Sequence, residues 1–245
     1  MNTNGTAGWI SLGFAAALAA VGISAQAAQP LITDDTVTQG TGQWRLELSG
    51  YDGDLAGGGD IEYYRGILSY GLGETLDLQA GVPWYRSGED GIGDTAIGLK
   101  WRFYQRGALS FAFKPALSVP TGDETDGHGT GKVNWGLRGI ASWLPGGAIS
   151  AHAHMGYRQN DNRLGQRESL TEYAAAVGYQ ISSVRFVGEV TTQTNPAHGG
   201  DQIRYSTIGV IWLATRNLDV DAGWRQGHGG APEDDLFTIG ATIRW

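Results

Sequence analysis

Leu236-Phe237-Thr238-Ile239-Gly240-Ala241-Thr242-Ile243-Arg244-Trp245 is the stretch that decides the fold. Successive side chains of a β-strand point to opposite faces. From Phe237 onward, the odd-numbered residues therefore form an apolar face that reaches the last residue, and the even-numbered residues form a small, mostly polar face. An amphipathic strand at the very end of a chain has to be fully paired, because an unpaired terminus frays. The first strand of the same chain is the expected partner, as in a closed barrel.

The composition favours a β-rich protein without cysteine chemistry. At 245 residues, with 41% hydrophobic and 17% charged residues, the chain suits one domain with a large apolar surface and is too apolar to be disordered. Its 40 glycines argue against a helical protein, since each interior glycine costs a helix roughly 1 kcal/mol relative to alanine. The net charge of −8 makes nucleic acid an unexpected partner, and the absence of cysteine excludes disulfides, thiolate metal sites and cysteine nucleophiles.

The first residues have the pattern of a secretory signal. Residues 10–23 are an apolar run, and Ala25-Gln26-Ala27 has the small-x-small form of a cleavage site. The alternative is a transmembrane anchor, but the run is shorter than the roughly 20 apolar residues that span a bilayer. We therefore expect a signal peptide at residues 1–27 and one β-barrel domain at residues 28–245.

Alternation of apolar and polar residues recurs through the rest of the chain. In residues 75–84, every second residue from Leu76 to Trp84 is apolar, and Asp77 and Gln79 lie between them, where we expect them to face water. Ten residues is about the length that a tilted strand needs to cross a bilayer. The pattern predicts strands at residues 43–51, 61–70, 75–84, 94–103, 108–119, 133–143, 148–158, 170–179, 184–194, 203–213, 218–224 and 236–245.

Two of these predicted strands are irregular. Pro115 cannot donate a ladder hydrogen bond, so we expect a bulge or a local break there. The register of residues 203–213 is ambiguous, because Ile208 and Trp212 face one way while Ile211 and Leu213 face the other.

The connections alternate in length, and aromatic residues mark one end of the strands. Short turns alternate with longer polar loops, such as residues 52–60, 120–132 and 226–235, as in outer-membrane barrels with short periplasmic turns and long outer loops. The strands that run into the short turns carry aromatic residues, which we expect to form a membrane-interface girdle. They are Tyr70, Phe103, Trp143, Tyr179, Trp212 and Trp245.

These features predict an all-β fold: a transmembrane antiparallel up-and-down β-barrel of about twelve strands in the outer membrane of a Gram-negative bacterium, surrounded by lipid. The alternative is a soluble β-sandwich or lipocalin-like barrel with its apolar face inside. The polar faces argue against it, because they carry charges of both signs that suit a water-filled or ion-paired lumen. These residues are Lys100, Arg102, Lys114, Arg138, His152, His154, Arg158, Glu172, Arg185, Glu189, Asp219, Asp221, Arg225 and Arg244.

Five stretches together resemble one family, the outer-membrane proteins associated with the meta-pathway of phenol degradation. The stretches are residues 30–35 (PLITDD), 70–78 (YGLGETLDL), 91–103 (GIGDTAIGLKWRF), 119–123 (VPTGD) and 215–223 (TRNLDVDAG). The resemblance implies a transporter-like, porin-like barrel that takes up small hydrophobic or aromatic compounds, with no agreed binding residues. The final aromatic resembles the terminal mark that the barrel-assembly machinery recognises in outer-membrane barrels, which implies that machinery as a partner.

Candidate sites for chemistry are few. His152 and His154 point the same way and could share a metal, but no third ligand is tied to them, so polar lumen residues are the better interpretation. Residues 123–127 (DETDG) have the composition of a calcium loop without its full spacing, which favours a solvated loop. An outer-membrane enzyme remains a minor alternative, since no serine lies in a strained glycine elbow. We expect no catalytic residues, cofactor or metal.

The sequence hypothesis is passive passage of small hydrophobic or aromatic compounds through the barrel. We expect Arg102, Arg138 and Arg185 to line the path, the alternative being that they form a structural ladder of ion pairs. A structural barrel whose lumen is plugged by inward side chains is the main competing function.

Overall fold

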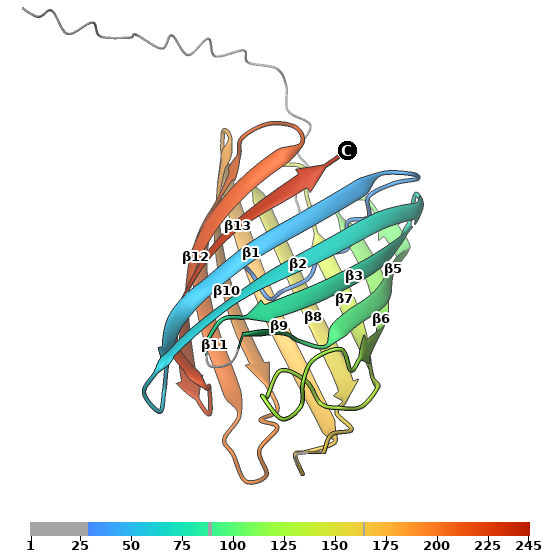
Figure 1. Ribbon diagram of the computed structural model, residues 1–245. Coiled ribbons are helices and arrows are strands. Elements are labelled where there is room, and N and C mark those ends of the chain that lie inside the picture. The colour runs from blue at the N-terminus through green and yellow to red at the C-terminus, as the bar shows by residue number, and fades with distance from the viewer. Residues whose placement is uncertain (1–28, 88–89, 164) are drawn as a thin grey trace, which may run out of the picture.

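The alternating residues form long antiparallel strands that close on themselves. In the computed structural model, which describes residues 29–87, 90–163 and 165–245, each wall strand pairs with its neighbours along the chain, and β1 also pairs with β13 (Figure 1). The predicted signal peptide and cleavage site lie outside the described residues. The strands are β1 (Trp44–Leu55), β2 (Asp60–Gly73), β3 (Leu76–Tyr85), β4 (Gly91–Ile92), β5 (Thr95–Arg106), β6 (Leu109–Val119), β7 (Asn134–Trp143), β8 (Ile149–Gln159), β9 (Ser169–Ile181), β10 (Val184–Gln193), β11 (Ile203–Leu213), β12 (Leu218–Gly229) and β13 (Glu233–Arg244).

The predicted closed barrel of about twelve strands is confirmed. Apart from β4, a two-residue strand that pairs only with the end of β3, the strands of the described residues form a twelve-stranded wall. Closure reaches the last residue: the Trp44 amide donates to the Trp245 carbonyl at 2.8 Å, and the Trp245 amide donates back at 3.1 Å. Within residues 29–87, 90–163 and 165–245, no helix is both long and apolar enough to cross a membrane.

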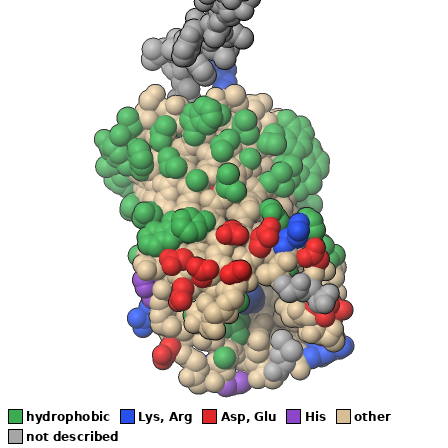
Figure 2. All heavy atoms as spheres, turned by 60° about the vertical axis from the view of Figure 1, so that its left-hand side comes forward, with side chains coloured by type: hydrophobic (Ala, Val, Ile, Leu, Met, Phe, Trp, Pro, Cys, Tyr) green, Lys and Arg blue, Asp and Glu red, His purple; other side chains and the backbone are tan. Residues whose placement is uncertain are grey.

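The wall has an apolar outer face and a polar inner face. The exposed large apolar residues include Leu78, Val190 and Ile239, whereas charged residues of the same strands, such as Asp77 and Glu189, are buried inside. Figure 2 shows hydrophobic side chains gathered over one broad band of the surface, with acidic side chains below it. Because the apolar band faces outward, the soluble-barrel alternative does not describe this wall.

Two predicted outer loops are wrong. The segments expected at residues 52–60 and 226–235 are mostly strand, which leaves only residues 56–59 between β1 and β2 and residues 230–232 between β12 and β13. Backbone pairing continues past the apolar residues, with Asp54 opposite both Asp60 and Asp235. Strand hydrogen bonds come from the backbone, so polar strand ends beyond the apolar band remain paired.

The structure shows how the two irregular strands, β6 and β11, are paired and oriented. Pairing between β5 and β6 passes from Gly98 opposite Ala116 to Trp101 opposite Phe113, so the predicted break at Pro115 is present. A bulge follows between Arg102 and Tyr104. In β11, Ile208 and Trp212 face outward and Ile211 is buried inside, because another part of the chain covers it there.

Candidate functional site

The lumen is crossed by the chain itself. Residues 29–41, which we call the lumen segment, precede β1 and run inside the barrel (blue coil in Figure 1). Their place in the lumen was not predicted from the sequence, because alternation locates only the wall strands. The buried residues of this segment include a threonine and an aspartate with almost no exposed surface, Thr36 and Asp35. A polar segment can be buried in this way only if the wall supplies partners for its polar groups.

An ion cluster holds the middle of the lumen segment. The Asp34 carboxylate lies 2.7 Å from Lys100 Nζ of β5, 2.8 Å from Lys114 Nζ of β6 and 3.6 Å from Arg138 Nη1 of β7. Arg138 also pairs with Glu172 of β9 at 2.6 Å. One aspartate of the segment therefore ties together three neighbouring wall strands by charge-assisted contacts, which are the stronger kind of hydrogen bond.

Backbone and hydroxyl groups complete the anchoring. The Ile32 amide donates to Glu189 Oε1 of β10 at 3.1 Å, and the Thr33 amide donates to the other carboxylate oxygen. Further round the wall, on β6 and β7, Thr36 Oγ1 lies 2.6 Å from Ser110 Oγ, and the Thr36 amide donates to Ser142 Oγ at 3.1 Å. The segment is thus hydrogen-bonded to β6, β7 and β10.

Apolar contacts fix where the segment begins. Leu31 packs in a buried cluster with Ala176, Val187 and Ile211 of the inner wall. These inward apolar residues explain the ambiguous register of β11, since its inner face covers Leu31 instead of water. Alternation in the sequence indicates that Ile211 faces inward. It does not indicate what covers Ile211, because Leu31 lies far away along the chain.

A row of aromatic rings lines the inner wall towards the outer loops. Tyr51, Tyr63 and Tyr85 lie opposite one another on β1, β2 and β3. The Tyr51 and Tyr63 rings stack with centroids 4.2 Å apart, Tyr63 and Tyr85 are 5.8 Å apart, and His128 of the β6–β7 loop stacks on Tyr85 at 5.1 Å. This row was not predicted from the sequence. Tyr51 and Leu48 are three residues apart on the same strand, so alternation places them on opposite faces, with Leu48 outside and Tyr51 inside.

The three arginines predicted to line a path are not brought together. Arg138 lies in the Asp34 cluster, whereas Arg185 is buried near the start of β10 and donates to Gln180 Oε1 at 2.9 Å. Arg102 lies near the end of β5 and donates to the Glu74 carbonyl at 3.0 Å. Their role in lining a path stays a prediction.

The six predicted girdle residues lie at the end of the barrel that carries the short turns. Phe103, Trp143, Tyr179, Trp212 and Trp245 are exposed on the outside, and Tyr70 is half-buried. The Trp44 ring lies 4.5 Å from the Tyr70 ring and 6.3 Å from the Trp245 ring, so the girdle is continuous across the closing seam. Their position at a membrane interface stays a prediction.

His152 and His154 contact different partners. His152 Nδ1 lies 2.9 Å from Ser142 Oγ, and His154 Nδ1 accepts the Asp34 amide at 3.1 Å. Among the described residues, no group of three or more histidine, aspartate and glutamate side chains is arranged to hold a metal ion. The Ser142–His152 contact does not form an accessible nucleophile, because Ser142 is 1% exposed and its oxygen already accepts the Thr36 amide.

The acidic loop after β6 contains hydrogen bonds between its own residues. Asp123 accepts hydrogen bonds from the Thr125 hydroxyl at 2.6 Å and the Thr125 amide at 2.8 Å. These bonds hold the pKa of Asp123 below its ordinary value. The carboxylate is therefore used within the loop, which fits the interpretation of a solvated loop.

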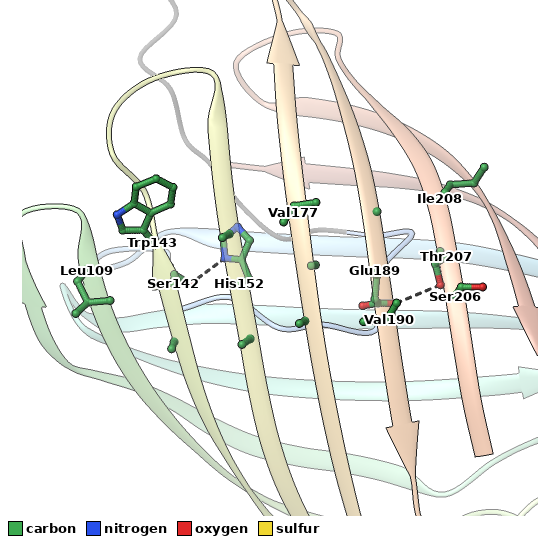
Figure 3. A pocket seen from close by; sticks show the side chains of 16 residues that line it. Leu109, Ser142, Trp143, His152, Val177, Glu189, Val190, Ser206, Thr207 and Ile208 are labelled. Carbon is green, nitrogen blue, oxygen red and sulfur yellow. Dashed lines mark hydrogen bonds between the residues drawn. The ribbon is translucent and has the colours of Figure 1, made fainter. Parts of the chain in front are cut away.

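A shallow hollow of about 640 Å³ lies on the wall between β6 and β11 (Figure 3). Its floor is formed by small outward residues, including Ala151, Ala153 and Ala175, between the bulkier Trp143 and Ile208. The polar members of the same strands, such as His152 and Glu189, are buried towards the lumen. The hollow therefore belongs to the lipid-facing surface and not to the lumen.

Comparison with known proteins agrees with this architecture. The family described as "Putative MetA-pathway of phenol degradation" matches residues 22–245. No curated protein sequence matches the chain.

Solved structures with a similar fold are outer-membrane channels and porins. The COG4313 outer membrane channel from Pseudomonas putida F1 is 12% identical, with a TM-score of 0.70 over 86% of this chain and 98% of that one. The NanC porin is 9% identical, with a TM-score of 0.61 over 82% and 98% of the two chains. The KdgM porin is 10% identical, with a TM-score of 0.58 over 81% and 98%. The fold is that of an outer-membrane β-barrel, in contact with lipid.

Proposed function

Because the chain belongs to the MetA-pathway of phenol degradation family, we propose that it is an outer-membrane channel for small, weakly polar aromatic molecules. Passage is passive: the protein uses no cofactor and no energy source of its own, and it is not an enzyme. The similar barrels are described as channels or porins, which supports a passage through the lumen.

The observation that carries the proposal is the inward row of Tyr51, Tyr63 and Tyr85. These rings offer flat apolar faces inside a wall that is otherwise polar, and aromatic rings attract one another in stacked or tilted arrangements worth about 0.5–1.5 kcal/mol beyond area burial. The row leads from the outer loops, where His128 continues it, to the lumen segment, where the Tyr51 hydroxyl donates to Gln29 Oε1 at 2.9 Å. A small aromatic solute could exchange partners along it.

Charge balance in the middle of the lumen also suits a weakly polar solute. Asp34, Asp35 and Glu172 lie against Lys100, Lys114 and Arg138, so three carboxylates neutralise three cations locally. A neutralised wall neither attracts nor repels an uncharged solute strongly. Arg102, Arg138 and Arg185 line the path in this proposal.

The test is uptake of phenol and of a charged sugar into liposomes that carry the purified protein. Phenol should enter faster than in liposomes with heat-denatured protein, and the sugar should not. Tyr63→Ala should slow phenol entry several-fold. Tyr64→Ala is the matched control, because Tyr64 is the neighbouring residue on the outer face and should leave entry unchanged. Equal entry of both solutes would indicate a general porin.

A second candidate function is a structural barrel without transport. The anchoring of the lumen segment to several wall strands favours it, because the segment fills the space that a solute would need. Entry of neither solute, with the wild-type protein correctly folded, would support this alternative and contradict a channel.

A further inference from the structure

A patch of the inner wall holds a carboxylate without a partner. The patch lies where the barrel closes, on β1, β13 and β12, and the strand register arranges its inward residues in rows. Glu47, Thr242 and Asp219 form one row, and Ser49, Gly240 and Asp221 form the next. Asp221 is 3% exposed, and its Oδ1 has no hydrogen-bond partner among the described residues.

The Asp221 side chain leans over the glycine in the centre of this patch. A Cβ atom placed on Gly240 would lie 2.6 Å from Asp221 Oδ2 and 2.7 Å from Oδ1. The carboxylate therefore occupies the hollow that Gly240 leaves on β13. Thr242 borders that hollow on β13, and Ser49 faces it from β1.

The two hydroxyl groups beside the hollow are also unpartnered. Ser49 Oγ and Thr242 Oγ1 are buried without a hydrogen-bond partner in the part of the chain that the structure describes. Thr242 is only 1% exposed. Buried polar groups are normally paired, so three unpaired oxygen-bearing side chains around one hollow indicate a missing partner.

The charges nearby define what the partner must be. Glu47 pairs with Arg45 at 3.1 Å, and Asp219 pairs with Arg244, so both of these carboxylates have a cation. Among the described residues, Asp221 is the one carboxylate of this patch without an ion pair, so it leaves one negative charge uncompensated. A buried unpaired carboxylate is destabilising, and a single positive charge beside it reduces that cost.

We propose that Asp221, Ser49 and Thr242 bind an alkali-metal cation on the inner wall. The ligands are one carboxylate and two hydroxyl oxygens, and such hard oxygen ligands suit hard cations. One uncompensated charge matches a monovalent ion. This site differs from the metal sites excluded above because it needs one carboxylate and not three acidic or histidine ligands.

The proposal is tested on the full-length, refolded protein in detergent, without any transport assay. Thermal unfolding is followed by heat-modifiable gel mobility in NaCl, KCl and choline chloride at equal ionic strength and in fixed urea. The wild type should unfold at a higher temperature in NaCl or KCl than in choline chloride, because choline is too large for the site. Binding to the folded state alone raises stability by mass action.

Asp221→Asn should abolish the difference between the salts and raise the unfolding temperature in choline chloride, because no unpaired charge remains. Thr242→Val, which keeps the shape and removes one ligand, should reduce the difference and provides a second variant if Asp221→Asn fails to fold. Asp201→Asn, in an exposed loop, is the control and should keep the wild-type difference.

Three results would overturn the proposal. The first is a wild-type unfolding temperature that is the same in all three salts. If that temperature changed only with pH, the Asp221 carboxyl would be protonated and would bind no cation. The second is a salt difference that persists in Asp221→Asn. The third is a response to micromolar CaCl₂ with none to Na⁺ or K⁺, which would mean a divalent site.

Discussion

Pro30 lies against two glycines of the inner wall, and this contact sets where the lumen segment crosses the barrel. A Cβ atom on Gly223 of β12 would lie 2.6 Å from the Pro30 ring, and one on Gly209 of β11 would lie 2.4 Å from it. Real Cβ atoms do not approach other atoms so closely, so any side chain at these positions would displace the proline.

Gly223→Ala should therefore loosen the lumen segment. Overpacking costs about 1–3 kcal/mol, so the population of undocked segment should rise roughly five-fold to a hundred-fold. The measurement is the rate at which a water-soluble maleimide labels Thr33→Cys, since the chain has no native cysteine. Thr33 is 2% exposed and its hydroxyl has no partner, so the cysteine itself loses no hydrogen bond.

Gly188→Ala is the matched control, because the nearest atom to its added methyl group would be 4.0 Å away. Labelling at the same rate in Gly223→Ala and Gly188→Ala would contradict the role assigned to the Pro30 contact.

At the residue scale, the sequence predicts the direction of a side chain better than its surroundings. Gln79 faces inward as alternation requires, yet it is 5% exposed and donates to Ser69 Oγ at 3.1 Å instead of facing open water. The same limit applies to Asp34 and Glu189. Their contacts depend on a segment that returns into the lumen, and periodicity carries no information about contacts between distant parts of the chain.

At the scale of the element, the two faces of each strand are set by alternation, and depth in the bilayer adds a second variable. Val177 lies towards the middle of β9, whereas Ile181 is the last residue of the same strand. Both lie on the outer face and are similarly exposed, at 61% and 55%. Any difference in the free energy of unfolding between substitutions at these two positions therefore reflects depth in the bilayer and not burial.

Val177→Arg should destabilise the barrel by roughly 2–4 kcal/mol, and Ile181→Arg by about 0–1 kcal/mol, because the cost of a charge on the lipid face falls towards the interface. The free energy of unfolding is measured by urea titration in lipid vesicles. Equal losses in the two variants would place both residues at the same depth and contradict the orientation of β9.

The elements show which sequence signals were sufficient. Strict alternation located the wall strands, and Pro115 marked the break between β5 and β6. The polar strand ends near residues 52–60 and 226–235 were mistaken for loops, because composition changes at the edge of the apolar band while backbone pairing continues.

At the scale of the whole molecule, closure of the barrel depends on pairing between the first strand, β1, and the last strand, β13. Trp245 contributes backbone hydrogen bonds to Trp44, and its ring lies parallel to the Trp44 ring. The ring itself is 53% exposed, almost the same as the 52% of Trp212 at the same end of the barrel. Burial alone would therefore assign the two tryptophans similar importance.

Deletion of Trp245 should nevertheless reduce assembly far more than Trp212→Ala, if the terminal aromatic is what the barrel-assembly machinery recognises. The measurement is the fraction of folded, heat-modifiable protein in isolated outer membranes. Similar folded fractions for the two variants would show that the terminal residue acts only through its contacts with β1.

The lumen segment also has a consequence for how the chain folds. Its Ile32–Glu189 hydrogen bond joins residues 157 positions apart, and the β1–β13 pairing joins residues farther apart still. Each of these long-range contacts would separately carry a large entropic cost of loop closure. Because residues 29–41 run directly into β1, docking the segment on β10 already brings β1 to the far side of the sheet. The two closures therefore share one entropic cost, and the formation of either contact makes the other a short-range step.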